Sequence, residues 1–223
     1  CFEPHGAESE RAARPGDMDL NDFPPMLLDE RPLPLAAPGW IYEIKYDGYR
    51  LMALFGNGEC RLRTRNGADA TLWFPEVAKS LAALRSGPYV TDGEICAFDE
   101  IGRSDFNRLQ ARARRRRWFE GCDPVGYAVF DLLVDRGINI TALPLVRRKA
   151  LLAELLDPPP DNILPVGHFH GDVPRIFHDA ALGLKLEAFV AKRAYSPYVP
   201  GTRSRDWVKV KRKGAVPAER FKR

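Results

Sequence analysis

One lysine of the chain has neighbours that could turn it into a nucleophile. Lys45 lies in the segment WIYEIKYDGYR (residues 40–50), between two tyrosines and directly before an Asp47-Gly48 turn. A neutral lysine amine is a strong nucleophile, but with an ordinary pKa of about 10.4 only about one in a thousand is neutral at pH 7. Lowering the pKa by about three units takes roughly 4 kcal/mol, which burial and neighbouring cations supply. Without them, a lysine at a strand end is a solvated side chain.

Three carboxylates occupy strand positions where an apolar residue or a strand end is expected. Glu94 leads a strand after the Asp-Gly turn of TDGEICAFD, Asp131 interrupts YAVFDLL, and Glu187 opens EAFVAKR. Burying a carboxylate is costly unless it meets a cation or hydrogen-bond donors. Structural ion pairs explain one or two of these residues, which leaves at least one for a functional site.

The segment WVKVK (residues 207–211) holds two lysines that point the same way if it is a strand. Side chains alternate between the faces of a strand, so Lys209 and Lys211 share one face about 7 Å apart, while Val208 and Val210 take the other. Two aligned ammonium groups can bind a phosphate. They can also form the wet face of an edge strand.

Composition excludes several classes of protein. The 223 residues are 45% apolar, which is enough for one large domain or two small ones. No run of about 18 apolar residues and no secretory leader occurs, so we expect no membrane partner and a cytoplasmic location. The cysteines lack the short paired spacings of a zinc site or redox motif and are expected to be reduced thiols: Cys1, Cys60, Cys96 and Cys122.

The net charge is only +4, but the positive charge is concentrated in RARRRRW (residues 112–118) and in the last 16 residues, 208–223. Such clusters favour a polyanionic partner, nucleic acid first. A solvated helix face or a tail is the alternative for each cluster. The candidates for contact with DNA backbone are Arg112, Arg114, Arg115, Arg116 and Arg117.

Hydrophobic periodicity indicates which elements carry these residues. Strands are expected at 40–46, 50–55 and 60–65, forming an antiparallel meander, and again at 89–100, 125–134, 186–193 and 207–211. Helices are expected within 71–87, at 106–119 after a cap at Ser104 or Asp105, and at 145–156. Because strands and helices do not alternate regularly, the pattern indicates an α+β fold with antiparallel sheets flanked by helices.

Six segments resemble, in this order, the motifs of the nucleotidyltransferase superfamily of ATP-dependent DNA ligases, RNA ligases and capping guanylyltransferases: EIKYDGYR, RTRNG, DGEICAFD, YAVFDLL, EAFVAKR and DWVKVK. PPML, FNRLQ and YSPYVPGTRSRDWVKVKRK resemble the ligase domain of bacterial end-joining ligase D and its stand-alone relatives. The resemblance implies the ATP-grasp-like nucleotidyltransferase fold, with an adenylation domain at 23–211. Residues 1–22 are then a linker-like extension and 212–223 a basic hinge or tail.

Carried over residue by residue, the resemblance implies covalent chemistry at Lys45. This residue would attack the α-phosphorus of ATP and become lysyl-AMP while pyrophosphate leaves. Glu43 would hold the adenine amino group, and Phe130 would stack on the base. Arg50 and Arg65 would contact the nucleotide sugar or DNA phosphates.

The remaining motif residues are implied to act on the ribose and the phosphates. Glu94 and Glu187 would act on the ribose and hold the catalytic Mg²⁺ or Mn²⁺, and the α-phosphate would be neutralised by Lys192, Lys209 and Lys211. Asp131 is expected to be structural. In the family, AMP then passes to the 5′-phosphate of nicked double-stranded DNA, and the 3′-hydroxyl attacks that phosphate to seal the strand.

Two features depart from the family pattern. Ala188 stands where the family usually has glycine, and the chain stops at Arg223, before the OB-fold domain that the family places after the VKVK strand. An isolated catalytic core of a larger end-joining polypeptide, a natural minimal form and a degenerate copy are the three explanations. Each predicts weak reaction with free ATP.

Two other functions compete with a bacterial, nucleoid-associated DNA ligase. One is an RNA ligase or capping-type nucleotidyltransferase, against which the ligase D segments argue. The other is a non-catalytic nucleic-acid-binding module of the same fold, which Ala188 and the missing second domain favour.

Overall fold

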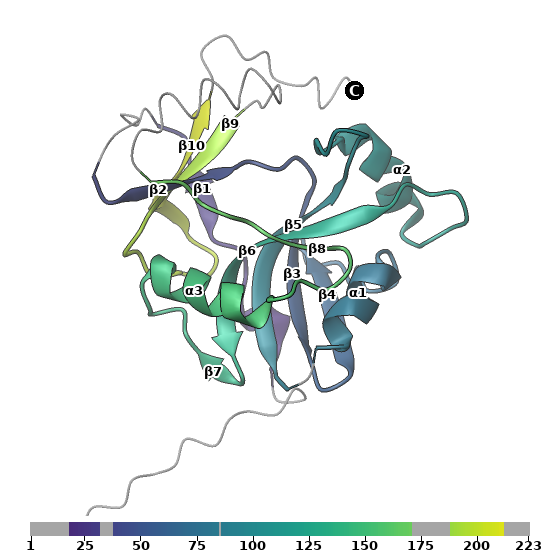
Figure 1. Cartoon of the computed structure of the whole chain (residues 1–223), viewed down its shortest axis with the longest axis horizontal. Coiled ribbons are helices and arrows are strands. Elements are labelled where there is room, and N and C mark those ends of the chain that lie inside the picture. Colours follow the sequence, from purple (N-terminus) through teal and green to yellow (C-terminus); the bar gives the residue numbers. More distant parts are fainter. Residues whose placement is uncertain (1–17, 32–37, 85, 171–187, 212–223) are drawn as a thin grey trace, which may run out of the picture.

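Two β-sheets and three α-helices form the described part of the chain (Figure 1). The computed structural model describes residues 18–31, 38–84, 86–170 and 188–211. The first sheet has the strand order β1-β10-β9-β2, with β1 at Leu27–Asp29, β10 at Arg203–Lys211, β9 at Ala188–Arg193 and β2 at Trp40–Ile44. The second sheet has the order β4-β3-β5-β6-β7, with β4 at Glu59–Thr64, β3 at Tyr49–Gly56, β5 at Tyr89–Ala97, β6 at Val125–Asp135 and β7 at Ile138–Asn139; β8, Ile163–Pro165, pairs with β6.

Antiparallel pairing dominates both sheets, and the expected α+β fold is confirmed. Two pairs are parallel, β1 with β10 and β6 with β8, which the sequence pattern did not indicate. The expected meander is wrong in one respect. β2 pairs with β9 in the first sheet, whereas β3 pairs with β4 and β5 in the second. The Asp47-Gly48 turn therefore carries the chain from one sheet to the other.

The helices begin and end where local chemistry favours it. α1 (Pro75–Ala82) has proline at its first turn and buries Val77 and Leu81, as the periodicity predicted. α2 (Phe106–Arg115) is capped by Asp105, whose carboxylate accepts the N–H groups of Asn107 and Arg108. α3 (Leu145–Leu155) ends shortly before the Asp-Pro-Pro-Pro segment.

Three apolar clusters hold these layers together. β3 is apolar on both faces and joins two of them, because its alternate residues point to opposite sides. Leu51 and Phe55 face the helices, while Met52 and Leu54 face the gap between the sheets, where Trp207 of β10 is buried. The outer face of the first sheet buries a third cluster: Trp40, Tyr42, Phe189, Ala191 and Val208.

The described body begins earlier than the expected boundary at residue 23. Leu20–Asp22 forms a short 3₁₀ helix, and Leu20 is buried beside Phe23 in the cluster between the sheets. Residues 18–22 therefore belong to the folded unit and not to a linker. Among the described residues, no helix has the length and apolar character that crossing a membrane requires.

Asp131 forms a buried ion pair, as expected for a structural carboxylate. Arg148 of α3 donates to both of its oxygens at 2.8 and 2.9 Å, and neither side chain is exposed. The same guanidinium donates to the carbonyl oxygens of Leu143 and Ser196. This network fastens α3 to β6.

Candidate active site

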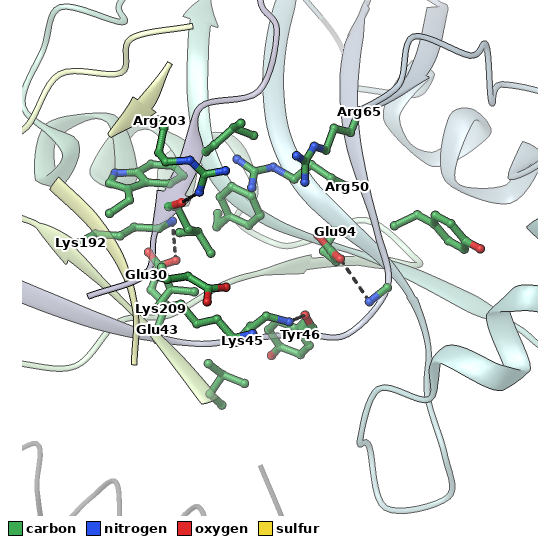
Figure 2. A pocket seen from close by; sticks show the side chains of 18 of the residues that line it. Glu30, Glu43, Lys45, Tyr46, Arg50, Arg65, Glu94, Lys192, Arg203 and Lys209 are labelled. Atoms are coloured by element: carbon green, nitrogen blue, oxygen red, sulfur yellow. Dashed lines mark hydrogen bonds and ion pairs between the residues drawn. The ribbon is translucent and has the colours of Figure 1, made fainter. Parts of the chain in front are cut away.

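A cavity of about 550 Å³ receives side chains from both sheets (Figure 2). Residues from the first sheet and its connections meet residues from β3, β5 and β6 around it. Eight of the predicted site residues line the cavity: Glu43, Lys45, Arg50, Arg65, Glu94, Phe130, Lys192 and Lys209. Glu187 lies outside the described residues, and so does the side chain of Lys211.

Lys45 follows the last residue of β2 and lies at the wall of the cavity (Figure 2). Its ammonium donates to the carbonyl oxygen of Tyr46 at 3.4 Å and lies 3.9 Å from Asp47 Oδ1. The side chain is 21% exposed, so the amine is partly shielded from water.

The turn after Lys45 is pinned to β5. The Gly48 N–H donates to Glu94 Oε1 at 3.2 Å, and the Asp47 N–H donates to Ser104 Oγ at 2.9 Å. A Cβ at residue 48 would lie 2.0 Å from the Ile95 carbonyl oxygen, so only glycine fits this approach. The contact brings Lys45 and Glu94 to the same cavity.

Glu94 is a carboxylate with an unusual protonation equilibrium. Burial raises the pKa of Glu94 to about 7, although Arg50 and Lys45 act in the opposite direction. Near neutral pH the group is therefore divided between its charged and neutral forms. A bound cation would shift it to the charged form.

Glu43 lies at the base of the cavity between two lysines. Lys149 of α3 is 2.7 Å from Glu43 Oε1, and Lys192 of β9 is 2.6 Å from Oε2. Burial by itself raises the pKa of Glu43, but the two ammonium groups outweigh burial and hold that pKa below its ordinary value. Burial lowers the pKa of Lys192 to about 8, with Glu43 opposing. The trio carries a net positive charge when both lysines are protonated.

Two aromatic rings form another wall. Phe130 and Trp207 meet edge to face with centroids 6.0 Å apart, and the Lys192 ammonium lies over both rings, 4.2 and 4.0 Å from their centroids. Arg50 also lies over Phe130, at 4.6 Å. Trp207 is 1% exposed, and its indole N–H has no acceptor among the described residues.

Arg50 is oriented by a buried network. It donates to both oxygens of Asp92 at 2.5 and 2.6 Å and to the Met26 carbonyl oxygen at 3.1 Å. The Tyr198 hydroxyl donates to the same Asp92 carboxylate at 2.7 Å. Burial lowers the pKa of Arg50, but the charge and the hydrogen bonds of Asp92 together outweigh burial and raise that pKa above its ordinary value. Arg50 is therefore a fixed cation at the cavity.

Arg112 is not available for DNA, which corrects the sequence-based expectation. Its side chain is 2% exposed and donates to both oxygens of Glu76 at 2.5 Å and to the Trp73 carbonyl oxygen at 2.8 Å. It fastens α2 to α1. The sequence could not distinguish this arginine from its neighbours, because its partner lies on another helix.

The other four arginines of the cluster are exposed. Arg114 and Arg115 lie in the last turn of α2, Arg116 ends the helix with a φ of 53°, and Arg117 follows it. They are far along α2 from Phe106, which lines the cavity at the start of this helix. None of these four lines the cavity.

The family assignment follows from comparison with known proteins. The family model described as the ATP dependent DNA ligase domain matches residues 33–211, the span that holds the cavity residues. The chain belongs to this family. The resemblance inferred from the six sequence motifs is therefore confirmed.

The relatives of this ligase domain include end-joining proteins. It is 37% identical over 172 residues to the multifunctional non-homologous end joining protein LigD of Pseudomonas aeruginosa, covering 77% of this chain and 20% of that protein. The SPbeta prophage-derived DNA ligase-like protein LigB of Bacillus subtilis is 33% identical over 187 residues, covering 83% of this chain and 66% of that protein. The solved ligase domain of M. tuberculosis LigD superposes with a TM-score of 0.73 at 31% identity, covering 87% of this chain and 62% of that chain. The chain thus spans only 20% to 25% of the length of the first two LigD relatives.

Several residues at the cavity of this ligase domain escaped sequence reasoning. Glu30, Arg203 and Trp207 line the cavity, Lys149 lies behind Glu43, and Asp92 and Tyr198 lie behind Arg50. A lysine within an amphipathic helix is typical of a solvated face, so Lys149 gave no signal. Trp207 had a weak sequence signal, because strand alternation places it on the same face as Lys209.

Proposed function

We propose that this ligase domain is the catalytic core of an ATP-dependent DNA ligase and that it takes AMP from ATP onto Lys45. The observation that carries the proposal is the meeting of the Lys45 amine, the Glu94 carboxylate and the cations Lys192 and Lys209 around one cavity. An amine nucleophile and converging cations are what transfer of a nucleotidyl group requires.

In the proposed reaction, the neutral amine of Lys45 attacks the α-phosphorus of ATP. A phosphorus–nitrogen bond forms, and the bond from the α-phosphorus to the pyrophosphate oxygen breaks. The attacking nitrogen, which carries a positive charge after the new bond forms, then loses one proton to solvent. Lys192 and Lys209 neutralise the charge that builds on the α-phosphate, and Lys211 is proposed to join them.

The base is proposed to stack on Phe130, with the amino group of adenine donating to Glu43. Three observations support this position: the ring lies in the cavity wall, the Glu43 carboxylate is charged, and the Trp207 indole N–H is still available to an acceptor. The Lys192 ammonium lies over the Phe130 ring, and a base stacked on that face of the ring would displace it. Lys192 would then be released toward the phosphate.

A divalent cation fits the site only in part. Among the described residues no group of three or more metal-binding side chains occurs, so the protein alone does not enclose an ion. Mg²⁺ usually binds one or two carboxylates together with substrate phosphates, and Glu94 is a carboxylate of that kind. We propose Glu94 and Glu187 as ligands of Mg²⁺ or Mn²⁺, which supplies charge neutralisation at the phosphates when bound.

We further propose that AMP passes to the 5′-phosphate of a nick in double-stranded DNA, for repair by end joining. The LigD names of the relatives support this role, and their greater length supports further domains that act with this one. The exposed arginines at the end of α2 are proposed to contact the DNA backbone. The proposed place of action is the bacterial cytoplasm, at the nucleoid.

The test is the mass of the intact chain after incubation with ATP and a divalent cation. The parent should gain the mass of one AMP, Lys45→Ala should gain none, and Lys79→Ala, which removes an exposed lysine of α1, should match the parent. Absence of the adduct from the parent after pyrophosphate stripping and long incubation would favour a non-catalytic binding module. Sealing of pre-adenylated nicks in DNA against RNA then separates a DNA ligase from an RNA ligase.

A further inference from the structure

Lys149 and Lys192 hold the same carboxylate but differ in their other bonds. The Lys149 ammonium is 2.7 Å from Glu43 Oε1 and donates to the carbonyl oxygens of Val166 at 2.9 Å and Phe130 at 3.3 Å. Lys149 therefore makes three polar contacts, one ion pair and two hydrogen bonds. Among the described residues, Lys192 has the single anionic partner Glu43.

This difference makes Lys149 the fixed cation and Lys192 the movable one. Lys149 is 6% exposed, and its acceptors come from β2, from β6 and from the segment after β8, so moving it would break contacts in both sheets. Moving Lys192 would break one ion pair and its contacts with the rings of Phe130 and Trp207.

The movement of Lys192 would leave Glu43 with one cation. Glu43 is 2% exposed, and an unpaired buried carboxylate would take up a proton and become a donor. A charged carboxylate only accepts hydrogen bonds. It therefore favours adenine, which presents an amino group at C6, over guanine, which presents a carbonyl oxygen at the same place.

We propose that Lys149 is a positioning residue for nucleotide selection, which keeps Glu43 a charged acceptor beside Phe130 when Lys192 turns to the phosphate. The inference rests on the proposed function. Lys149 itself is not expected to contact the nucleotide, because it lies behind Glu43 and does not line the cavity. The Lys149 ammonium also bridges the Glu43 carboxylate and the backbone carbonyl of Phe130.

The test compares the rate of lysyl-AMP and lysyl-GMP formation over a range of ATP or GTP concentrations. Lys149→Met should reduce the ATP-to-GTP preference by about tenfold or more, mainly through a higher half-saturating concentration of ATP and less through the maximal rate. Lys149→Arg should recover part of the preference. Lys79→Met, on an exposed site of α1, should keep the parent's value.

A double variant separates nucleotide selection from a structural role. Glu43→Gln should lose much but not all of the ATP-to-GTP preference, and adding Lys149→Met to it should reduce the preference little further, because both residues act through one interaction. Neither Glu43→Gln nor the double variant contains the Glu43 carboxylate, so neither buries an unpaired carboxylate. Their comparison therefore tests the role of Lys149 in nucleotide selection even if Lys149→Met alone unfolds.

Two results would overturn the inference: an unchanged ATP-to-GTP ratio in Lys149→Met, or a double variant whose preference falls well below that of Glu43→Gln. A parent chain that gains no nucleotide from either substrate overturns the proposed function instead. Equilibrium dialysis of the same variants with ATP and GTP then decides the inference through binding alone.

Discussion

The backbone N–H of Gly48 donates a 3.2 Å hydrogen bond to Glu94 Oε1, and this bond ties the crossing between the two sheets to β5. Lys45 precedes the crossing, and Glu94 lies on β5, which pairs with β3, the strand that follows the crossing. The positions of the amine and the carboxylate at the cavity thus depend on one tight turn.

Gly48→Ala should disrupt this turn. The added Cβ would meet the Ile95 carbonyl oxygen at 2.0 Å and Cys96 Sγ at 2.9 Å, so β5 or the turn must shift. We expect a loss of about 1–3 kcal/mol in the free energy of unfolding, measured with urea, and a much slower AMP addition. Gly167→Ala is the matched control, because a Cβ there meets nothing within 4 Å. Equal AMP addition in the two variants would contradict the role of the turn.

Glu94→Gln should change how stability depends on pH. The pKa of Glu94 in the folded chain is about 7, above its ordinary value of 4.5, so the folded chain holds this proton more tightly than the unfolded one. The stability that the neutral form provides is complete below pH 4.5 and is lost as the pH rises through 7. The parent should therefore lose up to about 3 kcal/mol relative to Glu94→Gln between pH 4.5 and pH 8.

Urea unfolding at a series of pH values, without divalent cations, measures this difference. Glutamine keeps an oxygen that can accept the Gly48 N–H, so the variant isolates the charge. Glu120→Gln removes an exposed carboxylate and should follow the parent curve. Parallel curves for the parent and Glu94→Gln would show that Glu94 titrates normally.

The five arginines of residues 112–117 should divide into one structural residue, Arg112, and four that bind DNA. Arg112→Met should cost about 3 kcal/mol of stability, since it breaks the paired hydrogen bonds to Glu76. Changing the exposed arginines 114–117 to glutamine should alter stability by less than about 0.5 kcal/mol. It should weaken binding of nicked DNA and flatten the dependence of affinity on salt, because fewer counterions are released. Binding titrations at several salt concentrations test this, and an unchanged salt slope would contradict it.

Arg148→Met should be among the most destabilising changes in α3. It leaves Asp131 buried without its cation, which costs about 3–5 kcal/mol. Arg147→Met, one residue earlier but exposed, should change the urea midpoint little. Replacing Asp131 with leucine in the Arg148→Met chain should restore part of the loss, since no buried charge is then unpaired.

Much of the fold was readable from local patterns. The strands at β3 and β6, the buried face of α1 and the Asp105 cap of α2 all follow from periodicity and capping chemistry. The sequence pattern does not predict to which sheet each strand belongs. β2 and β3 are consecutive and look like a hairpin, but Gly48 approaches β5 so closely that the chain crosses to the other sheet.

The site residues that belong to sequence motifs could be predicted. Those whose position depends on an ion pair with a residue far away in the chain could not. Lys45, Glu94 and Lys209 were expected together and do line one cavity. Arg112 and Lys149 are both cations on helices, and sequence alone describes each as solvated. Their burial depends on Glu76 and Glu43, carboxylates that lie far away in the chain.

The strand order of the first sheet places β2 beside β9, and β9 beside β10. Lys45, after β2, and the lysines of β9 and β10 are thus brought together although they are more than 140 residues apart in the sequence. Under the proposed function, a nascent chain that contains Lys45 but not yet β9 and β10 should not accept AMP. The proposed uptake of nucleotide would then begin only once both strands have joined the first sheet.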